Sequence, residues 1–423
     1  VNKVKFNISS GRGKIAFQEP IRVSAMVKEI KFLGQYDKIV SRLKIENFTL
    51  DLGKDGALRL PAPFDHDWPS RKVSLKGDYD FDFERLTVQE INFFIKEIIV
   101  NASATIQKFK NKVTFEFDGK ANDLAIRQIL AAWPKEFSGI TRKWLAENLV
   151  EGSIPAMKAN MIGHYSRKNG FEVSSMLGIF DFQDVTVNYF SSMPLNAAEG
   201  KIKFGRDQID IKITHGKLDD LLIESGQVIL TGLDKVDQKV AVQLGIKGPI
   251  GSAIKVAESS SLKLLKSIGY ASNLVKGNFI SKINLDFILE KNLTLDKIKM
   301  STNGVLKNVA VPQIALDLDL TMGNLMFKAD NDSMMITGNG ELSGVKTEIE
   351  WHENFTNKRP YRRKYRLKAI VNEQNWREKL KLTFPPFNAT YTNGVMGADV
   401  TIKVSNDGSG DLKANLDLKD TLI

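Results

Sequence analysis

The residues of this chain that could serve a metal site or acid–base catalysis are few and scattered. Its four histidines, His66, His164, His215 and His352, lie far apart in the sequence, and none has a partner at the spacing of a zinc site. The D-H-D motif around His66 stands between prolines, which favours a solvated loop. The 423 residues include no cysteine, which excludes disulfides, thiolate metal ligands and thiol catalysis. We therefore expect no metal site, no cofactor, no catalytic residues and no enzymatic activity.

Two further motifs resemble ion- or phosphate-binding loops only in part. The motif D-N-D at 330–332, with Glu341 beyond it, has the outline of a calcium loop, but the turn glycine is missing and strand-like sequence surrounds it. The motif G-R-G-K at 11–14 lacks the spacing of a phosphate-binding loop and the Ser or Thr that follows its lysine. A hairpin turn is the better interpretation of this second motif.

A basic run between Lys358 and Lys368 could bind anions, and the net charge of +10 also favours anionic partners. Tyr361 and Tyr365 interleave with its cations, an arrangement that suits phosphates of lipid headgroups or of nucleic acid. We interpret the run first as a solvated hairpin, then as a contact for anionic lipid, and we expect no nucleic acid because no nucleic-acid-binding fold accompanies it. Its candidate contact residues are Arg359, Arg362, Arg363, Lys364 and Arg366.

The element that must position any site is the β-strand, because most of the chain alternates apolar and polar residues with a period of two. Turn signals such as Asp407-Gly408 separate runs of 6 to 12 residues, the rhythm of an antiparallel meander. We predict a mainly β protein: an elongated, curled antiparallel β-groove with a few amphipathic helical insertions. The alternation predicts these inward-facing residues: Val73, Leu75, Phe81, Phe83, Val113, Phe115, Phe117, Val185, Val187, Ile209 and Ile211.

Three segments have helical rather than strand spacing, and the first two end alike. N-L-V-E-G-S-I begins at Asn148 and N-L-V-K-G-N-F at Asn273, an offset of 125 residues, so a unit of about 120 residues recurs. Gly152 and Gly277 are predicted to cap these helices at the C-terminal end. The predicted order is β-groove over 1–121, helix within 122–152, β-groove over 153–250, helix within 251–277, β-groove over 278–371, then a short helix and the last strands over 372–423.

A meander of this length cannot stay a flat sheet, since open sheets beyond about ten strands usually curl, split or close. If the sheet curls into an open trough, its apolar side becomes a groove on the order of 120 to 140 Å long, at about 4.8 Å for each of some 25 to 30 strands. Such a groove suits lipid, because each buried methylene is worth about 0.8 kcal/mol. The helices would cover sections of it through Trp133, Trp144, Leu145 and Leu149.

Several motifs resemble the AsmA-like proteins of Gram-negative bacteria, in particular their YhdP-like branch. The similarity lies in the Trp133-Pro134 and Trp144-Leu145 segment with its exit through Gly152 and Ile154, and in motifs further along the chain. These are F-D-F-Q-D-V-T-V-N-Y-F-S-S-M-P-L at 180–195, A-E-G-K-I-K-F at 198–204, G-P-I-G-S-A-I-K-V-A-E at 248–258 and S-G-V-K-T-E-I-E-W ending at 351.

The resemblance implies a periplasmic β-groove that is anchored in the inner membrane and carries phospholipid towards the outer membrane. The implied partners are phospholipid acyl chains, a membrane reached through an anchor outside this sequence, and envelope proteins at the ends of the groove. The chain itself has no apolar run near the 18 or so residues of a membrane span. It also begins V-N-K-V-K-F without a signal sequence or a Met, so we expect a fragment.

One alternative stays open from the sequence. The same alternation is compatible with a structural or adhesive β-rich scaffold that binds protein or glycan on its outer side. In that case the residues predicted to face inward would form an ordinary closed sandwich core.

Overall fold

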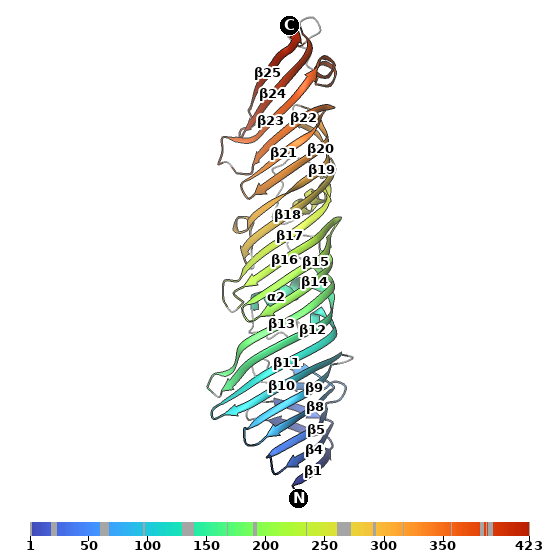
Figure 1. Cartoon of the computed structure of the whole chain (residues 1–423), viewed down its shortest axis with the longest axis vertical. Helices are drawn as coiled ribbons and strands as arrows, with labels where there is room; N and C mark the ends of the chain where they lie inside the picture. The colour runs from blue at the N-terminus through green and yellow to red at the C-terminus, as the bar shows by residue number, and fades with distance from the viewer. Residues whose placement is uncertain are drawn as a thin grey trace. The chain divides into compact units, whose positions relative to one another are not determined.

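The computed structural model of the chain is dominated by antiparallel β-strands (Figure 1). It describes residues 2–17, 23–59, 67–95, 98–128, 139–166, 168–188, 193–233, 235–259, 272–290, 293–315, 317–356, 358–380, 385, 387 and 392–422. The strands that follow one another in the chain are neighbours in a 21-stranded sheet, and four short strands form a second sheet. The predicted class, a mainly β protein with an antiparallel sheet and few helices, is confirmed.

The described chain divides into two units, which we treat separately. Unit 1 comprises residues 1–187, 197–212 and 229–238, and unit 2 comprises 188–196, 213–228 and 239–423. The strands β14 (Leu195–Gly205), β15 and β16 therefore contribute residues to both. Their bounds are Gln208–Leu218 for β15 and Leu221–Thr231 for β16.

Unit 1 is built on a sheet in which β1, β4, β5 and β8 to β13 pair antiparallel in that order. Its elements are β1 (Lys3–Ser10), β2 (Gly13–Phe17), β3 (Val23–Val27), β4 (Glu29–Asp37), β5 (Arg42–Asp51), β6 (Ala57–Arg59), β7 (Asp67–Pro69), β8 (Lys72–Asp80), β9 (Arg85–Ile95), β10 (Ile98–Phe109), β11 (Lys112–Ala125), α2 (Gly139–Asn148), β12 (Leu149–Ser166), β13 (Gly170–Val187) and β14 (Leu195–Gly205).

The second sheet of unit 1 consists of β2, β3, β6 and β7, paired in that order. Its residues Ala25, Val27 and Leu58 pack against Leu50 and Val73 of the large sheet. This part of unit 1 is therefore a two-layered sandwich with a closed apolar core, because side chains of two facing sheets interdigitate there.

Unit 2 continues the same plan, with β17 to β25 paired antiparallel in chain order. Its elements are β17 (Lys239–Pro249), α3 (Ile250–Ser259), β18 (Lys276–Ile288), the short helix η1 (Leu295–Lys297), β19 (Lys299–Ala315), β20 (Leu318–Asp330), β21 (Ser333–Leu342), β22 (Val345–Asn354), β23 (Tyr361–Asn372), the π-helical turn η2 (Asn375–Lys379), β24 (Asn393–Ser405) and β25 (Gly410–Leu422).

Gly152 and Gly277 are not helix caps, so this prediction was wrong. Both lie inside strands, β12 and β18, with φ of 146° and 117°. A Cβ at Gly152 would meet Val185 on the next strand, and one at Gly277 would meet Val309. The recurring feature is therefore a close approach between two strands, which only glycine allows at this backbone conformation.

Candidate functional site

One side of the sheet in unit 1 carries the apolar residues, and we call it the apolar face. On β11 it carries Val113, Phe115 and Phe117, which pair directly with Tyr165, Gly163 and Met161 of β12. Met157 of β12 continues this face to Phe180 of β13. Because successive side chains of a strand point to opposite sides, the residues between these positions form the polar outer face.

Most residues predicted to face inward in unit 1 lie on this apolar face. Val113, Phe115, Val185 and Ile209 are buried, and Phe117, Val187 and Ile211 are half-buried. The half-buried Phe117 lies beside Met161, its direct partner on β12, and Met157 of the same strand is also only partly covered. This stretch of the apolar face is therefore accessible in part.

Phe81 and Phe83 lie beyond the end of the strand to which the alternation assigned them. The Phe81 ring packs edge-on against Tyr79 of β8 and Tyr36 of β4, with ring centroids 4.7 Å and 5.5 Å apart. Strand β8 ends at Asp80, and both phenylalanines follow in the turn to β9, with exposed fractions of 48% and 61%. The Asp80 carboxylate accepts hydrogen bonds from the backbone N–H groups of Asp82 and Phe83, at 3.1 Å and 3.2 Å. These bonds hold the turn, although the alternation of the sequence runs on through it.

Val73 and Leu75 lie on β8, where the second sheet covers the large one. Val73 is buried in the sandwich core with Leu50 and Ala25, and Leu75 is half-buried. Around Val73 the two sheets thus form a closed sandwich core, as a β-rich scaffold would have, and not an open groove.

The alternation-based list missed several large residues of the apolar face. Phe180 and Phe182 of β13 and Ile154 of β12 are buried there, and Phe171 packs against Phe115 with ring centroids 4.5 Å apart. The sequence F-D-F at 180–182 carries the same alternation as the strands that were chosen, so the signal was present.

In unit 2 the apolar face is the side that carries a large buried cluster, which includes Leu325, Ile336, Ile349, Trp351 and Leu367. These residues belong to consecutive strands from β20 to β23. The whole cluster is between 1% and 8% exposed, so this part of the apolar face is well covered.

Two helical segments of unit 2 cover its apolar face. Ile250, Ala253 and Val256 of α3 pack against a cluster that contains Ile246 and Phe279 of the sheet. Trp376 of η2 is completely buried among Val345, Val371 and Met396, and its Nε1–H donates a hydrogen bond of 3.2 Å to the Phe387 carbonyl. The helices of the second and third predicted segments thus act as covers, a role that the amphipathic spacing had suggested.

The first predicted helical cover, which was assigned Trp133, Trp144, Leu145 and Leu149, agrees with the structure only in part. Trp144 and Leu145 lie half-buried on α2, whereas Leu149, assigned to this helix, is the buried first residue of β12. Trp133 lies outside the described residues. Helix α2 is fixed by a buried hydrogen bond of 2.6 Å between the Thr141 hydroxyl and Gln238 Oε1.

Charge is almost absent from the apolar face of unit 2. Among the described residues of β18 to β24, strand register places only Glu353 and Arg363 on this face as charged residues, and they pair with each other. A buried charge is costly unless it is paired, which accounts for this arrangement.

The basic run is divided between the two faces of β23. Arg363 points to the apolar face, while Lys364 and Arg366 lie on the outer face. Arg362 lies at an irregularity of the strand, and its Nε is 3.6 Å from the Glu353 carboxylate. Arg366 binds the Asp399 carboxylate through two hydrogen bonds, of 3.1 Å and 2.8 Å. The Arg366 hydrogen bond holds the pKa of Asp399 below its ordinary value. Arg359 precedes the strand and donates to the Tyr361 hydroxyl at 3.4 Å.

This division changes the interpretation of the run. Arg362, Arg363 and Arg366 already have carboxylate partners, so they are poorly suited to recruit an anion. The predicted headgroup contact therefore falls to Arg359 and Lys364.

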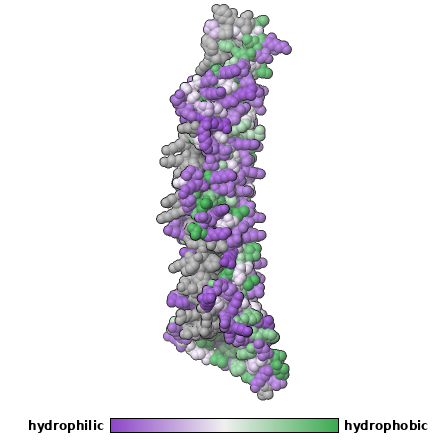
Figure 2. Space-filling view, turned by 90° about the vertical axis from the view of Figure 1, so that its left-hand side faces the viewer, coloured by the Kyte–Doolittle hydropathy of each residue, from purple (hydrophilic) through white to green (hydrophobic). Residues whose placement is uncertain are grey.

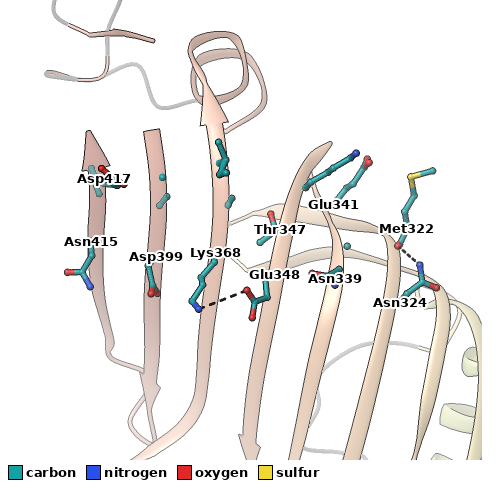
Figure 3. A pocket seen from close by; sticks show the side chains of 17 residues that line it. Met322, Asn324, Asn339, Glu341, Thr347, Glu348, Lys368, Asp399, Asn415 and Asp417 are labelled. Atoms are coloured by element: carbon teal, nitrogen blue, oxygen red, sulfur yellow. Dashed lines mark hydrogen bonds and ion pairs between the residues drawn. The ribbon is translucent and has the colours of Figure 1, made fainter. Parts of the chain in front are cut away.

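The outer face of unit 2 has a hollow of about 1020 Å³ over β20 to β25, lined by polar residues and by exposed apolar side chains such as Met322 and Ile370 (Figure 3). A row of directly paired residues crosses it from strand to strand, and Glu348 and Lys368 within the row form an ion pair of 4.0 Å. The row consists of Asn324, Asn339, Glu348, Lys368, Asp399 and Asn415. Such cross-strand pairs stabilise the sheet and keep its outer face wet.

Figure 2 shows one side of the molecule, on which hydrophilic residues cover most of the described surface and hydrophobic ones form small separate groups.

Within the described part of the chain, no three His, Asp or Glu side chains converge in a way that could hold a metal ion. None of the described helices is long and apolar enough to cross a membrane.

Comparison with known proteins adds no relative. No protein-family model, no curated protein and no solved structure matches this chain.

Proposed function

We propose that this protein is a non-enzymatic lipid-binding protein whose apolar face holds the acyl chains of phospholipids and carries them between membranes. The observation that supports this proposal is the near-absence of charge on the apolar face of many successive strands, whose charged residues lie almost entirely on the outer face. An acyl chain needs an apolar surface without fixed charges, because its contacts are non-directional and scale with the area removed from water.

The accessible part of the face in unit 1 is where lipid would make contact. Phe117, Met157 and Met161 are only half-buried, and thioether side chains adapt to irregular apolar partners. The resemblance to the YhdP-like branch supports a periplasmic setting, with phospholipid moving between the inner and outer membranes. An anchor and partners at the groove ends belong to the same proposal.

The proposal is tested by photo-crosslinking at two neighbouring residues of β11. A photoreactive phenylalanine analogue replaces Phe117, on the apolar face, or Glu116, which is exposed on the outer face of the same strand. After irradiation in living cells, mass spectrometry should find phospholipid adducts at position 117 and not at position 116. Equal labelling at both positions, or adducts at neither, would contradict lipid binding.

A structural β-scaffold is the second candidate function, because two parts of the apolar face are closed. The sandwich core around Val73 and the cluster around Ile349 leave little room for a ligand. A scaffold predicts that the protein purified from a membrane-containing lysate carries no phospholipid, which native mass spectrometry measures directly.

A further inference from the structure

Aromatic rings of the apolar face lie on glycines of neighbouring strands. The Phe115 ring covers Gly163, its direct partner across β11 and β12, and a Cβ at Gly163 would lie 2.5 Å from Phe115 Cζ. Phe182 covers Gly200 in the same way, with a corresponding distance of 2.8 Å. The Phe204 ring covers Gly178 even more closely.

The same arrangement occurs in unit 2, where Phe327 of β20 covers its direct partner Gly304 of β19. A Cβ at Gly304 would lie 2.8 Å from the Phe327 ring. The pattern therefore belongs to both units and is not a peculiarity of one strand pair.

The physical effect is on the height of the apolar face. Side chains of a strand normally stand roughly perpendicular to the sheet, so a phenylalanine ring would project far above it. A glycine on the next strand leaves a gap at Cβ, and the ring can lie down in that gap. The face then keeps its aromatic area but leaves more free depth above the sheet.

We propose that these Phe–Gly pairs set the depth available to acyl chains, and that Gly178 with Phe204 is a depth-setting pair of unit 1. This inference rests on the proposed lipid-binding function and adds the residues that position its floor. Phe204 is half-buried and lies beside the buried Phe180, with ring centroids 6.1 Å apart, so its ring is at the accessible surface of the face.

Gly178 is the one of these glycines where the inference can be tested cleanly. At Gly163, Gly200 and Gly304 an added Cβ would also collide with a backbone carbonyl oxygen, so a substitution there would distort the strands. At Gly178 the three nearest atoms all belong to the Phe204 ring. An alanine at this position therefore displaces the ring and leaves the neighbouring backbone in place.

The experiment measures phospholipid bound per folded protein in the full chain, by native mass spectrometry after expression in bacteria. Gly178→Ala should lower the bound phospholipid about fourfold. This is the change expected if the raised ring keeps one methylene group of the acyl chain from being buried on the face. Phe204→Ala removes the ring from the floor and is the reference for the double variant. Gly178→Ala/Phe204→Ala should bind as much phospholipid as Phe204→Ala alone, because no ring is left for the added methyl group to displace.

Gly205→Ala is the matched control, because it adds the same methyl group next to Phe204 where the nearest atom is 3.5 Å away. It should keep the wild-type amount of lipid, and circular dichroism checks that every variant is folded. Unchanged lipid in Gly178→Ala, or a fourfold loss from Gly178→Ala that persists in the Phe204→Ala background, would overturn the depth-setting role alone. A wild-type protein without phospholipid would overturn the proposed function as well.

Discussion

On the apolar face of unit 2, the Arg363 guanidinium donates two hydrogen bonds to the Glu353 carboxylate, of 2.5 Å from Nε and 3.1 Å from Nη2. Trp351 Nε1–H donates to the same carboxylate at 3.1 Å, and the guanidinium lies over the Trp351 ring at 5.7 Å. Glu353 is completely buried. The pair therefore fixes the register of β22 and β23 at the end of an otherwise apolar surface.

Removal of this carboxylate should destabilise unit 2 strongly. Glu353→Ala leaves the partly exposed Arg363 charge without its main partner and the Trp351 Nε1–H without its acceptor, which should cost about 3 kcal/mol. Urea denaturation followed by tryptophan fluorescence measures the loss. Glu348→Ala, which removes one partner of the exposed 4.0 Å pair with Lys368, is the control and should cost less than about 1 kcal/mol. Similar losses for both variants would contradict a special role of the buried pair.

The pair of Arg366 and Asp399 should make stability depend on pH at the acid end. The Arg366 hydrogen bond lowers the pKa of Asp399 in the folded state, so the folded protein holds this carboxylate charged at lower pH than the unfolded chain does. Its stabilising effect is thus present above the ordinary aspartate pKa of about 3.9, and is lost as pH falls through the lower folded value.

Asp399→Asn should accordingly reduce the urea midpoint at pH 7, while the difference from wild type should shrink towards pH 3. High salt should also reduce the difference at pH 7, because the pair is partly exposed. Asp411→Asn on the outer face of β25 serves as the control, since Asp411 makes no ion pair with the described residues. A difference for Asp399→Asn that stays constant with pH would argue against the pair.

Helix α2 should depend on the hydrogen bond between Thr141 and Gln238. Thr141→Val keeps the side-chain volume but leaves the buried Gln238 without this bond of 2.6 Å, at a cost of about 1 to 3 kcal/mol. Hydrogen exchange of the amides of residues 139–148 should become faster in this variant. Thr141→Ser retains the hydroxyl and should keep slow exchange, and faster exchange in both variants would show that the hydroxyl is not the anchor.

Truncation of Phe115 should destabilise the protein far more than truncation of Phe83, although both residues follow the same alternating sequence pattern. Phe115→Ala removes a buried ring that packs on Phe171 and should cost about 3 to 5 kcal/mol. Phe83→Ala removes an exposed turn residue and should change stability by about 0.5 kcal/mol or less. Thermal melting of the two variants separates these values, and a large loss for Phe83→Ala would place it back on the apolar face.

The sequence predicted the faces of most strands well. Val113, Phe115 and Ile209 were assigned to the buried side from alternation alone, because the period of two is fixed by backbone geometry and does not depend on distant contacts. Alternation does not reveal where β8 ends, because it continues through Phe81 and Phe83, whereas hydrogen bonds to the Asp80 carboxylate place both residues in a turn.

By itself, the sequence thus determined a mainly β chain with one apolar and one polar side to its strands, interrupted by amphipathic helices. Only the tertiary structure decided what lies on the apolar side. A second sheet covers Val73, η2 places Trp376 over β22 to β24, and phenylalanine rings settle on glycines of the next strand. These contacts depend on strand register and on pairs such as Glu353 and Arg363, which join residues of different strands, and local residue patterns do not encode that information.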